Sequence, residues 1–199
     1  MENRSTAAGS SCDIGSNRGK SVKGRQGGGI AKARRAGIPV SERRVIADIE
    51  EFGWHSMDVM EDTGHAPWTF TIGFHETWQH PELIIIGRSR ATAQFILNTV
   101  ASGLDENRRP DLAGTTLDLL PGIPCCFVEV SARHYPEYVD FARTCYSRGE
   151  RSPLYQIVWP SNDGHFPWSP DASTHFKNWQ PVLGKAPTGA EPVFEAGHT

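Results

Sequence analysis

The run Leu83–Ile86 restricts the fold more than any other part of this sequence. Four large apolar residues follow one another between Glu82 and Gly87, so a strand built from them is apolar on both of its faces. A strand of this kind is typical of the middle of a sheet, where neighbouring elements bury both faces. The sequence therefore predicts a central strand here.

The remaining pattern predicts further strands and three helices. Alternating or mainly apolar residues predict four more strands, over 54–60, 68–74, 125–131 and 154–160. The polar connection 104–124 has room for one short edge strand. Apolar residues at helical spacing predict helices over 41–53, 89–104 and 135–149. This order favours a single α+β domain with a mostly antiparallel, barrel-like or open sheet and the three helices to one side.

The charge distribution divides the chain into a basic tail and an acidic domain. Residues 1–40 contain eight Lys and Arg against two Asp and Glu, a net charge of +6, and the other twelve basic and twenty-one acidic residues leave −9 for 41–199. Because the tail is rich in Gly, Ser and Arg and has little to bury, we expect it to be disordered. We expect the same of the Pro- and Gly-rich stretch 185–199. The predicted folded domain is 41–184.

These charges also bear on partners and location. A basic tail can contact nucleic acid, but the net charge of the domain opposes a groove for a phosphate backbone, so nucleic acid is disfavoured. No stretch approaches the roughly 18 apolar residues of a membrane span, and no apolar segment follows the tail as in a secretion signal. We expect a cytoplasmic protein without membrane association. The oligomeric state is not indicated.

The four cysteines point to packing rather than to chemistry. They are Cys12, Cys125, Cys126 and Cys145, and no two have the Cys-x-x-Cys spacing of a zinc ribbon or a dithiol redox motif. Cys125 and Cys126 are neighbours in a predicted strand, so their side chains point to opposite faces. We expect at least one of them in the core, where a thiol is a poor nucleophile.

The bend His75–Glu82 is the first candidate site. His75, His80 and Glu82 lie close in sequence between two predicted strands, and their side chains could converge at one end of the sheet. With a third source of ligands, such as His55 or the segment 163–165, they would suit zinc or iron, although the spacing matches no known metal motif. Without a metal, His80 and Glu82 would form the polar centre of a pocket.

A structural reading of the same bend is simpler. In it His80 bonds the backbone, Pro81 fixes the bend, and Glu82 pairs with Arg88 or Arg90. His55 has the same ambiguity, because a lone histidine on an apolar strand face is usually a hydrogen-bonded core residue. Beside a buried Glu82, however, His55 would be a candidate acid or base.

The aromatic residues at the end of the last predicted strand and in the segment after it form the second candidate region. Trp159 and Trp168 could form the wall of a concave binding site, and Asp163 lies in the turn between them. They could equally close the end of the sheet as a lid over the core. We expect these side chains and the His75–Glu82 bend to face each other across one hollow. His80, Glu82 and His55 would then be catalytic, and Trp159, Asp163, Trp168 and His75 would bind the substrate.

Several motifs resemble those of one bacterial family. These are "GWHSMDVMED", "PWTFTIGFHETWQHPELIIIG", "LLPGIPCCFVEV" and "YQIVWPSNDGHFPW", which occur in order between Val45 and Trp168. In this arrangement the chain resembles the DUF4262 family, a bacterial domain of unknown function, with Phe74 where the family usually has Leu. The resemblance implies one domain in a bacterial setting and assigns no catalytic residue.

The order of predicted elements around "PELIIIG", a strand, a short turn, a second strand and a helix, is also similar to that of flavin-reductase split barrels. The set of Arg, Lys and Ser that would hold a flavin phosphate is missing from the expected positions. The leading hypothesis is a pocket that binds or acts on a small molecule or peptide. The alternative is a regulatory or immunity-like module that binds another protein. A metal-dependent enzyme and a flavin-binding split barrel are lesser alternatives. The sequence leaves open the ligand, any cofactor and whether the chain is an enzyme.

Overall fold

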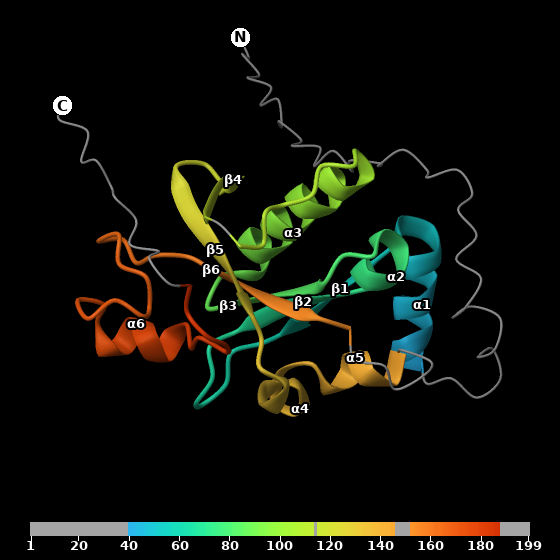
Figure 1. The fold of residues 1–199 in the computed structure, drawn as a ribbon. Coiled ribbons are helices and arrows are strands. Elements are labelled where there is room, and N and C mark those ends of the chain that lie inside the picture. The colour runs from blue at the N-terminus through green and yellow to red at the C-terminus, as the bar shows by residue number, and fades with distance from the viewer. Residues whose placement is uncertain (1–39, 114, 146–151, 188–199) are drawn as a thin grey trace, which may run out of the picture.

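The computed structural model describes residues 40–113, 115–145 and 152–187, which form one α+β domain (Figure 1). Its six described strands are β1 (His55–Val59), β2 (Trp68–Ile72), β3 (Glu82–Ile86), β4 (Thr115–Leu120), β5 (Ile123–Glu129) and β6 (Leu154–Val158). The described helices are α1 (Val40–Phe52), α2 (Phe74–Trp78), α3 (Arg90–Asp105), α4 (Tyr135–Tyr138), α5 (Asp140–Cys145) and α6 (Thr174–Trp179), with a 3₁₀ turn at Ala132–His134.

The strands form one mixed sheet in the order β1-β2-β3-β6-β5-β4. Four of the five described pairings are antiparallel, and β3 pairs with β6 in parallel. The sheet curls like half a barrel, because β5 and β4 rise beside α3 instead of continuing the plane of the other strands (Figure 1). The α+β prediction is confirmed, and β4 is the short edge strand expected between 104 and 124.

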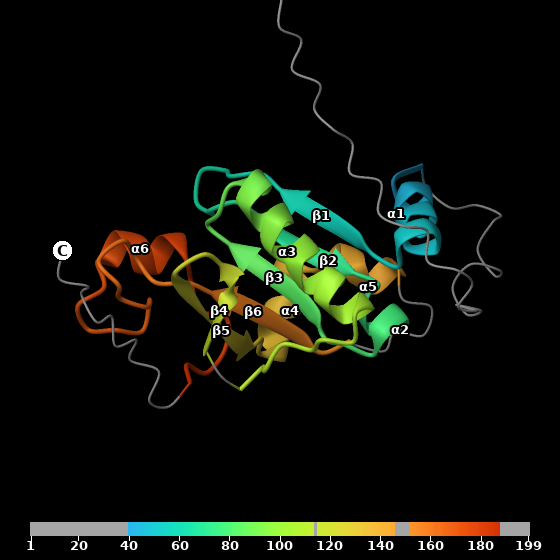
Figure 2. The ribbon, with the colours of Figure 1, turned by 90° about the horizontal axis from the view of Figure 1, so that it is seen from above.

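The apolar run is the central strand that its composition predicts. All five residues of β3 are buried, and their side chains alternate between two separate apolar clusters. Leu83 and Ile85 pack with α2 and α3, whereas Ile84 and Ile86 pack with residues of α1, α4 and α5. The helices therefore cover both faces of the sheet (Figures 1 and 2). The expectation of helices to one side was wrong, because a strand that is apolar on both faces needs cover on both.

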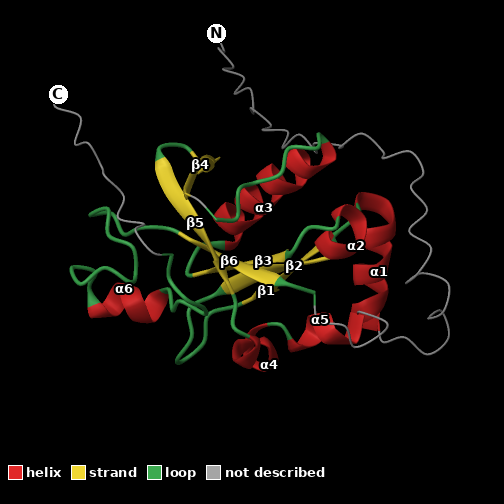
Figure 3. Cartoon of the chain, in the orientation of Figure 1, coloured by secondary structure: helices red, strands yellow, loops and turns green. Residues whose placement is uncertain are grey.

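Local structure departs from the predicted elements in two places. The strand predicted to reach Phe74 ends at Ile72, because Gly73 adopts a left-handed conformation with φ of 109° and begins α2. As far as residue 145, the helix predicted over 135–149 is divided into α4 and α5, with Val139 between them at a φ of −138°, and 146–149 lie outside the described residues. Figure 3 shows α4 and α5 as two short helices on the side of the sheet opposite α3.

Two buried glutamines fasten the C-terminal segment to the sheet. Gln156 of β6 donates from Nε2 to the carbonyl of Pro181 over 2.8 Å and accepts at Oε1 from the N–H of Leu183 over 2.9 Å. Gln180 binds both the N–H and the carbonyl of Trp159. Gly184 then bridges to Val130, and a Cβ on this glycine would lie 1.9 Å from the carbonyl oxygen of Glu129. These contacts hold the segment that follows α6 against β6 and β5.

The predicted limits of the domain are only partly covered by the structure. The tail predicted over 1–40 lies outside the described residues except for Val40, with which α1 begins. The stretch predicted to be loose, 185–199, is described as far as residue 187. Among the described residues, no helix is long and apolar enough to cross a membrane.

Candidate functional site

The buried carboxylate of Glu82 accepts hydrogen bonds from the backbone at the start of α2. Its side chain is at the first residue of β3 and is 3% exposed. Oε1 accepts from the backbone N–H groups of Gly73 and His75, each over 3.0 Å, and Oε2 accepts from the hydroxyl of Thr71 over 2.5 Å. The carboxylate thus takes the place of a capping side chain, which Gly73 lacks.

The predicted partners of Glu82 are engaged elsewhere. Arg90 pairs with Asp58 over 2.9 Å, and the guanidinium of Arg88 lies over the ring of Trp159. The structural reading was therefore wrong about an arginine, because the backbone N–H groups at the start of α2 donate to the Glu82 carboxylate instead. The side chain of His75 is exposed, so this residue contributes only its backbone to the network.

His80 is enclosed beside this network. Its side chain is 2% exposed, Nδ1 lies 2.7 Å from the carbonyl oxygen of Pro81, and buried Nε2 has no hydrogen-bond partner among the described residues. Burial lowers the pKa of His80 below its ordinary value, and the charge of Arg109 lowers it further, against the bond to Pro81. The imidazole is therefore neutral near pH 7, with Nδ1–H donating to Pro81.

This burial predicts a pH dependence of stability. Because the pKa of His80 is lower in the folded chain than in the unfolded one, the unfolded chain binds the proton first as pH falls below about 6.5. The free energy of unfolding should fall in that window by at most about 1.4 kcal/mol per pH unit from this residue, and level off below the folded-state pKa. Urea unfolding from about pH 8 to 5 measures the slope.

Two variants make this measurement specific. His80→Gln should have a smaller slope than the parent chain, whereas His75→Gln, which changes an exposed histidine, should keep the parent slope. Equal slopes for the parent chain and His80→Gln would show that His80 does not cause the pH dependence.

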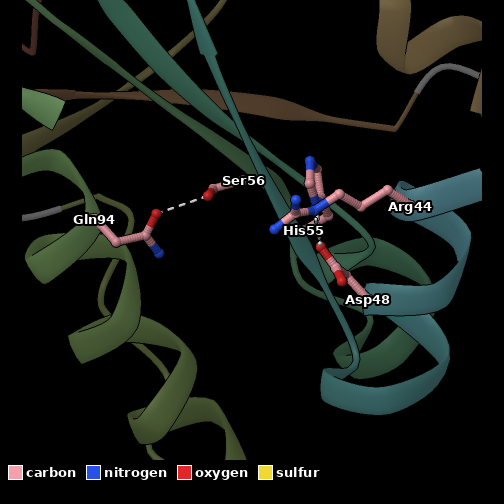
Figure 4. Close-up of polar contacts among 5 residues, drawn as sticks. All are labelled: Arg44, Asp48, His55, Ser56 and Gln94. Carbon is pink, nitrogen blue, oxygen red and sulfur yellow. Dashed lines mark hydrogen bonds and ion pairs between the residues drawn. The ribbon is translucent and has the colours of Figure 1, made fainter. Parts of the chain in front are cut away.

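His55 joins α1 to the edge of the sheet. Its Nδ1 lies 2.7 Å from Oδ2 of Asp48 on α1, and Arg44 approaches the same oxygen at 3.9 Å. The next residue, Ser56, points to the other side of β1 and donates to Gln94 of α3 over 2.7 Å (Figure 4). His55 thus has Asp48 as its partner rather than Glu82.

The metal hypothesis finds no ligand set in the part of the chain that the structure describes. Within those residues, no group of three or more His, Cys, Asp and Glu side chains could hold a metal ion. The side chain of His55 contacts Asp48 of α1, the side chain of His75 is exposed, and Asp163 lies in an exposed turn. The predicted ligands therefore do not converge on one point.

The predicted hollow between the bend and the aromatic segment does not form. Glu82 pairs with Leu154 at the beginning of the parallel strands β3 and β6, while Trp159 directly follows the end of β6. Five residues of strand place them about 16 Å apart. Trp168 is on the other face of the sheet from Trp159, because it stacks on Phe166, which packs with Cys126 and Val158.

The structure instead brings an arginine to Trp159. The chain leaves β3 through Gly87 and Arg88, beside the point where it leaves β6 through Trp159. The guanidinium carbon of Arg88 lies 3.5 Å from the centroid of the Trp159 ring, a cation–π contact. We call Arg88 and Trp159 the edge site. It is at the carboxyl ends of two parallel strands, where open α/β sheets commonly bind ligands.

The indole of the edge site is held rigidly. Gln180 binds the backbone of Trp159 on both sides, Nε1 of Trp159 donates to the carbonyl of Ile86 over 3.4 Å, and Phe176 packs edge-on against the ring. Gly87 has a φ of 80°, and a Cβ there would lie 2.8 Å from the indole of Trp179. The aromatic side chains of α6 therefore fix the position of the strand ends.

Arg88 has no anionic partner in the described residues. None of the ion pairs among them includes Arg88, and its buried Nε has no hydrogen-bond acceptor. Burial lowers the pKa of the Arg88 guanidinium from its usual value, but an arginine remains charged at neutral pH. Burial also raises the pKa of Cys125, which faces Arg88, to about 11, so this thiol is protonated and does not neutralise the charge.

Sequence reasoning did not identify Arg88 as a site residue. The available signal was an arginine directly after the glycine that ends the central strand. That signal becomes informative only when β6 is known to pair with β3 in parallel, since this pairing supplies Trp159.

The family model for a domain of unknown function, DUF4262, matches residues 48–173. The chain belongs to the DUF4262 family. The match extends from the middle of α1 to just before α6, so the DUF4262 region contains both Arg88 and Trp159 but not the residues of α6 that support them. The curated proteins and the solved structures that were searched contain no match to the chain.

Proposed function

We propose that this DUF4262 protein binds a small molecule with an anionic group, and that Arg88 is the residue that holds the anion. The observation that supports the proposal is a partly buried guanidinium, fixed over an indole, that lacks an anionic partner among the described residues. A charge removed from water is costly unless another charge or hydrogen bonds compensate it. An anionic ligand would supply both.

The proposal keeps the small-molecule hypothesis and relocates the binding residues. Trp159 remains a wall of the site, whereas His80 and Glu82 belong to the buried support of α2 at the opposite end of β3. Trp168 and Asp163 lie outside the edge site. Location in a bacterial cytoplasm stays a prediction from the sequence.

Ligand-induced stabilisation tests the proposal. A panel of small carboxylates, phosphates and sulfates at millimolar concentration should include members that raise the Tm, because a ligand that binds only the folded chain stabilises it. At about one hundred times its Kd, a ligand adds roughly 2.7 kcal/mol, which corresponds to several degrees for a domain of this size. Chloride at equal ionic strength is the reference.

A matched pair of variants locates the effect. Arg88→Met should abolish the rise in Tm, since methionine keeps the apolar contact with Trp159 but has no charge. Arg108→Met should retain it, because Arg108 is exposed, pairs with Glu106 and lies past the far end of α3. If no anion raises the Tm of the parent chain, or if Arg88→Met responds as the parent does, the proposed function is wrong.

A further inference from the structure

Aromatic side chains surround the guanidinium of Arg88. Phe176 packs edge-on against the indole of Trp159 with 5.2 Å between ring centroids, and the guanidinium carbon of Arg88 lies 3.5 Å from the same indole centroid. The phenyl centroid and the guanidinium carbon therefore cannot be more than about 9 Å apart, the sum of these two distances. Trp179 lies beside Gly87, the residue before Arg88, because its indole donates to the Gly87 carbonyl over 2.8 Å. We call Trp159, Phe176 and Trp179 the aromatic wall.

The polar groups of the aromatic wall are already used within the protein. The indole N–H of Trp159 donates to the carbonyl of Ile86, and the indole N–H of Trp179 donates to the carbonyl of Gly87. Gln180 binds both backbone groups of Trp159. The third member of the wall is a phenylalanine, whose side chain has no polar atom. The wall can therefore offer a ligand apolar contact but no side-chain hydrogen bond.

On the neighbouring strand the polar side-chain atom is also engaged. Cys126 of β5 pairs with Val158 of β6, so Cys125 and Trp159 are the next residues of adjoining strands, and both belong to one apolar cluster. The thiol of Cys125 donates to the carbonyl of Ile123 over 3.8 Å. Burial raises the pKa of this thiol to about 11, so it stays protonated and uncharged near pH 7. The strand next to β6 thus continues the apolar surroundings of the edge site.

One charged group beside an apolar wall favours a ligand that is divided in the same way. The guanidinium of Arg88 includes a buried Nε without a hydrogen-bond acceptor among the described residues, and an anionic head would supply acceptors to this group. Hydroxyl groups elsewhere on the ligand would lose water against the aromatic wall without gaining a partner, which weakens binding. Apolar carbon in the same position gains from burial, by up to about fourfold in affinity for each methylene.

Resting on the proposed function, we propose that the ligand of the edge site is a small organic anion with an apolar body, either an alkyl chain or a hydrocarbon ring. Its anionic head binds Arg88, and its body lies on the aromatic wall, where Phe176 is the specificity-determining contact. Hydroxylated acids and sugar phosphates also have an anionic head, but they bind weakly because the wall cannot form hydrogen bonds with their hydroxyl groups.

Two acids with the same ring and the same charge test this inference. Cyclohexanecarboxylate is compared with quinate, which has several hydroxyl groups on the same ring, and acetate measures the binding of the head alone. The signal is the Nε–H resonance of Arg88 in protein labelled with ¹⁵N-arginine, assigned by its loss in Arg88→Lys. We expect cyclohexanecarboxylate to bind at least about tenfold more tightly than either quinate or acetate.

Phe176→Asn tests the contact with the apolar body. It should weaken the binding of cyclohexanecarboxylate about tenfold and the binding of acetate, which is too short to reach the wall, less than about threefold. Phe52→Asn makes the same change at a phenylalanine that is 52% exposed, and should alter neither affinity. Phe52 precedes His55, which pairs with the end of β2, so it lies at the opposite end of the sheet from Arg88. Circular dichroism and the Tm show that each variant is folded before its two affinities are compared.

An apolar residue at the C-terminus of a peptide combines the same two features, so a further titration distinguishes this source. N-acetyl-leucine is compared with a short peptide that ends in leucine, in free and in amidated form. Binding of the free peptide that is no tighter than that of N-acetyl-leucine supports a small anion. Tighter binding of the free peptide, lost on amidation, would show that a peptide C-terminus is the ligand and would overturn the inference of a small anion.

The outcomes separate this inference from the proposed function. If quinate or acetate binds the parent chain at least as tightly as cyclohexanecarboxylate, the inference of an apolar body is wrong while an anion site at Arg88 stands. The same holds if Phe176→Asn weakens acetate and cyclohexanecarboxylate equally. If none of the probes shifts the Arg88 resonance or raises the Tm, the proposed function itself fails.

Discussion

Glu82→Ala is expected to lower the free energy of unfolding by about 4 kcal/mol, the largest effect predicted for a single substitution in this chain. The variant removes the acceptor shared by the N–H groups of Gly73 and His75, and the partner of the Thr71 hydroxyl. Each hydrogen bond to a charged group contributes about 1.5–3 kcal/mol, and all three lie in or beside the core. Urea unfolding followed by tryptophan fluorescence measures the change.

Two further variants define what the carboxylate does. Glu82→Gln keeps one acceptor oxygen, so its cost should be smaller, about 1–2 kcal/mol. Glu51→Ala alters an exposed glutamate of α1 and should change stability by less than about 0.5 kcal/mol. A Glu82→Ala protein as stable as Glu51→Ala would show that this network does not support the fold.

Gln156→Leu is expected to lower the free energy of unfolding by about 3 kcal/mol. Leucine fills a similar volume but cannot bind the carbonyl of Pro181 or the N–H of Leu183, and each buried backbone group that loses its partner costs about 1–3 kcal/mol. The same contacts hold the segment that contains Gln180, which in turn holds Trp159. The variant should therefore also weaken anion binding at the edge site.

Hydrogen exchange distinguishes this local effect from a general loss of stability. In Gln156→Leu the amide of Leu183 should exchange much faster than in the parent chain. Amides in the middle of β3 should exchange faster only by the amount that the loss in global free energy of unfolding explains. Asn98→Leu, on the exposed face of α3, is the control for a polar-to-apolar change. Unchanged exchange at Leu183 would contradict the role given to Gln156.

Local patterns were sufficient to predict most of the secondary structure. The run Leu83–Ile86 specified a central strand, because a strand with one face in water would expose half of these four large apolar side chains. The apolar stripe of α3 appeared at helical spacing, and its members Ala93, Ile96, Leu97, Val100 and Leu104 are all buried. The family was also identified correctly from motifs in the sequence.

The short helices were harder to predict, because their stability comes from distant residues. A five-residue helix such as α2 has too few internal hydrogen bonds to form by itself. It depends on the carboxylate of Glu82, which belongs to the next strand. Similarly, α6 follows a turn-rich segment and is placed by contacts of Phe176 and Trp179 with the strand ends.

The amino-acid sequence by itself determined which segments become strands and long helices, since the spacing of the apolar residues matches the period of a strand or of a helix. Only the tertiary structure decided which strands are neighbours and which polar side chains meet. Any strand can offer the same backbone hydrogen bonds, so the parallel pairing of β3 with β6 depends on the packing of the whole domain. That pairing moved the candidate site from the histidines of the bend to Arg88 and Trp159, which are far apart in the chain and adjacent in the fold.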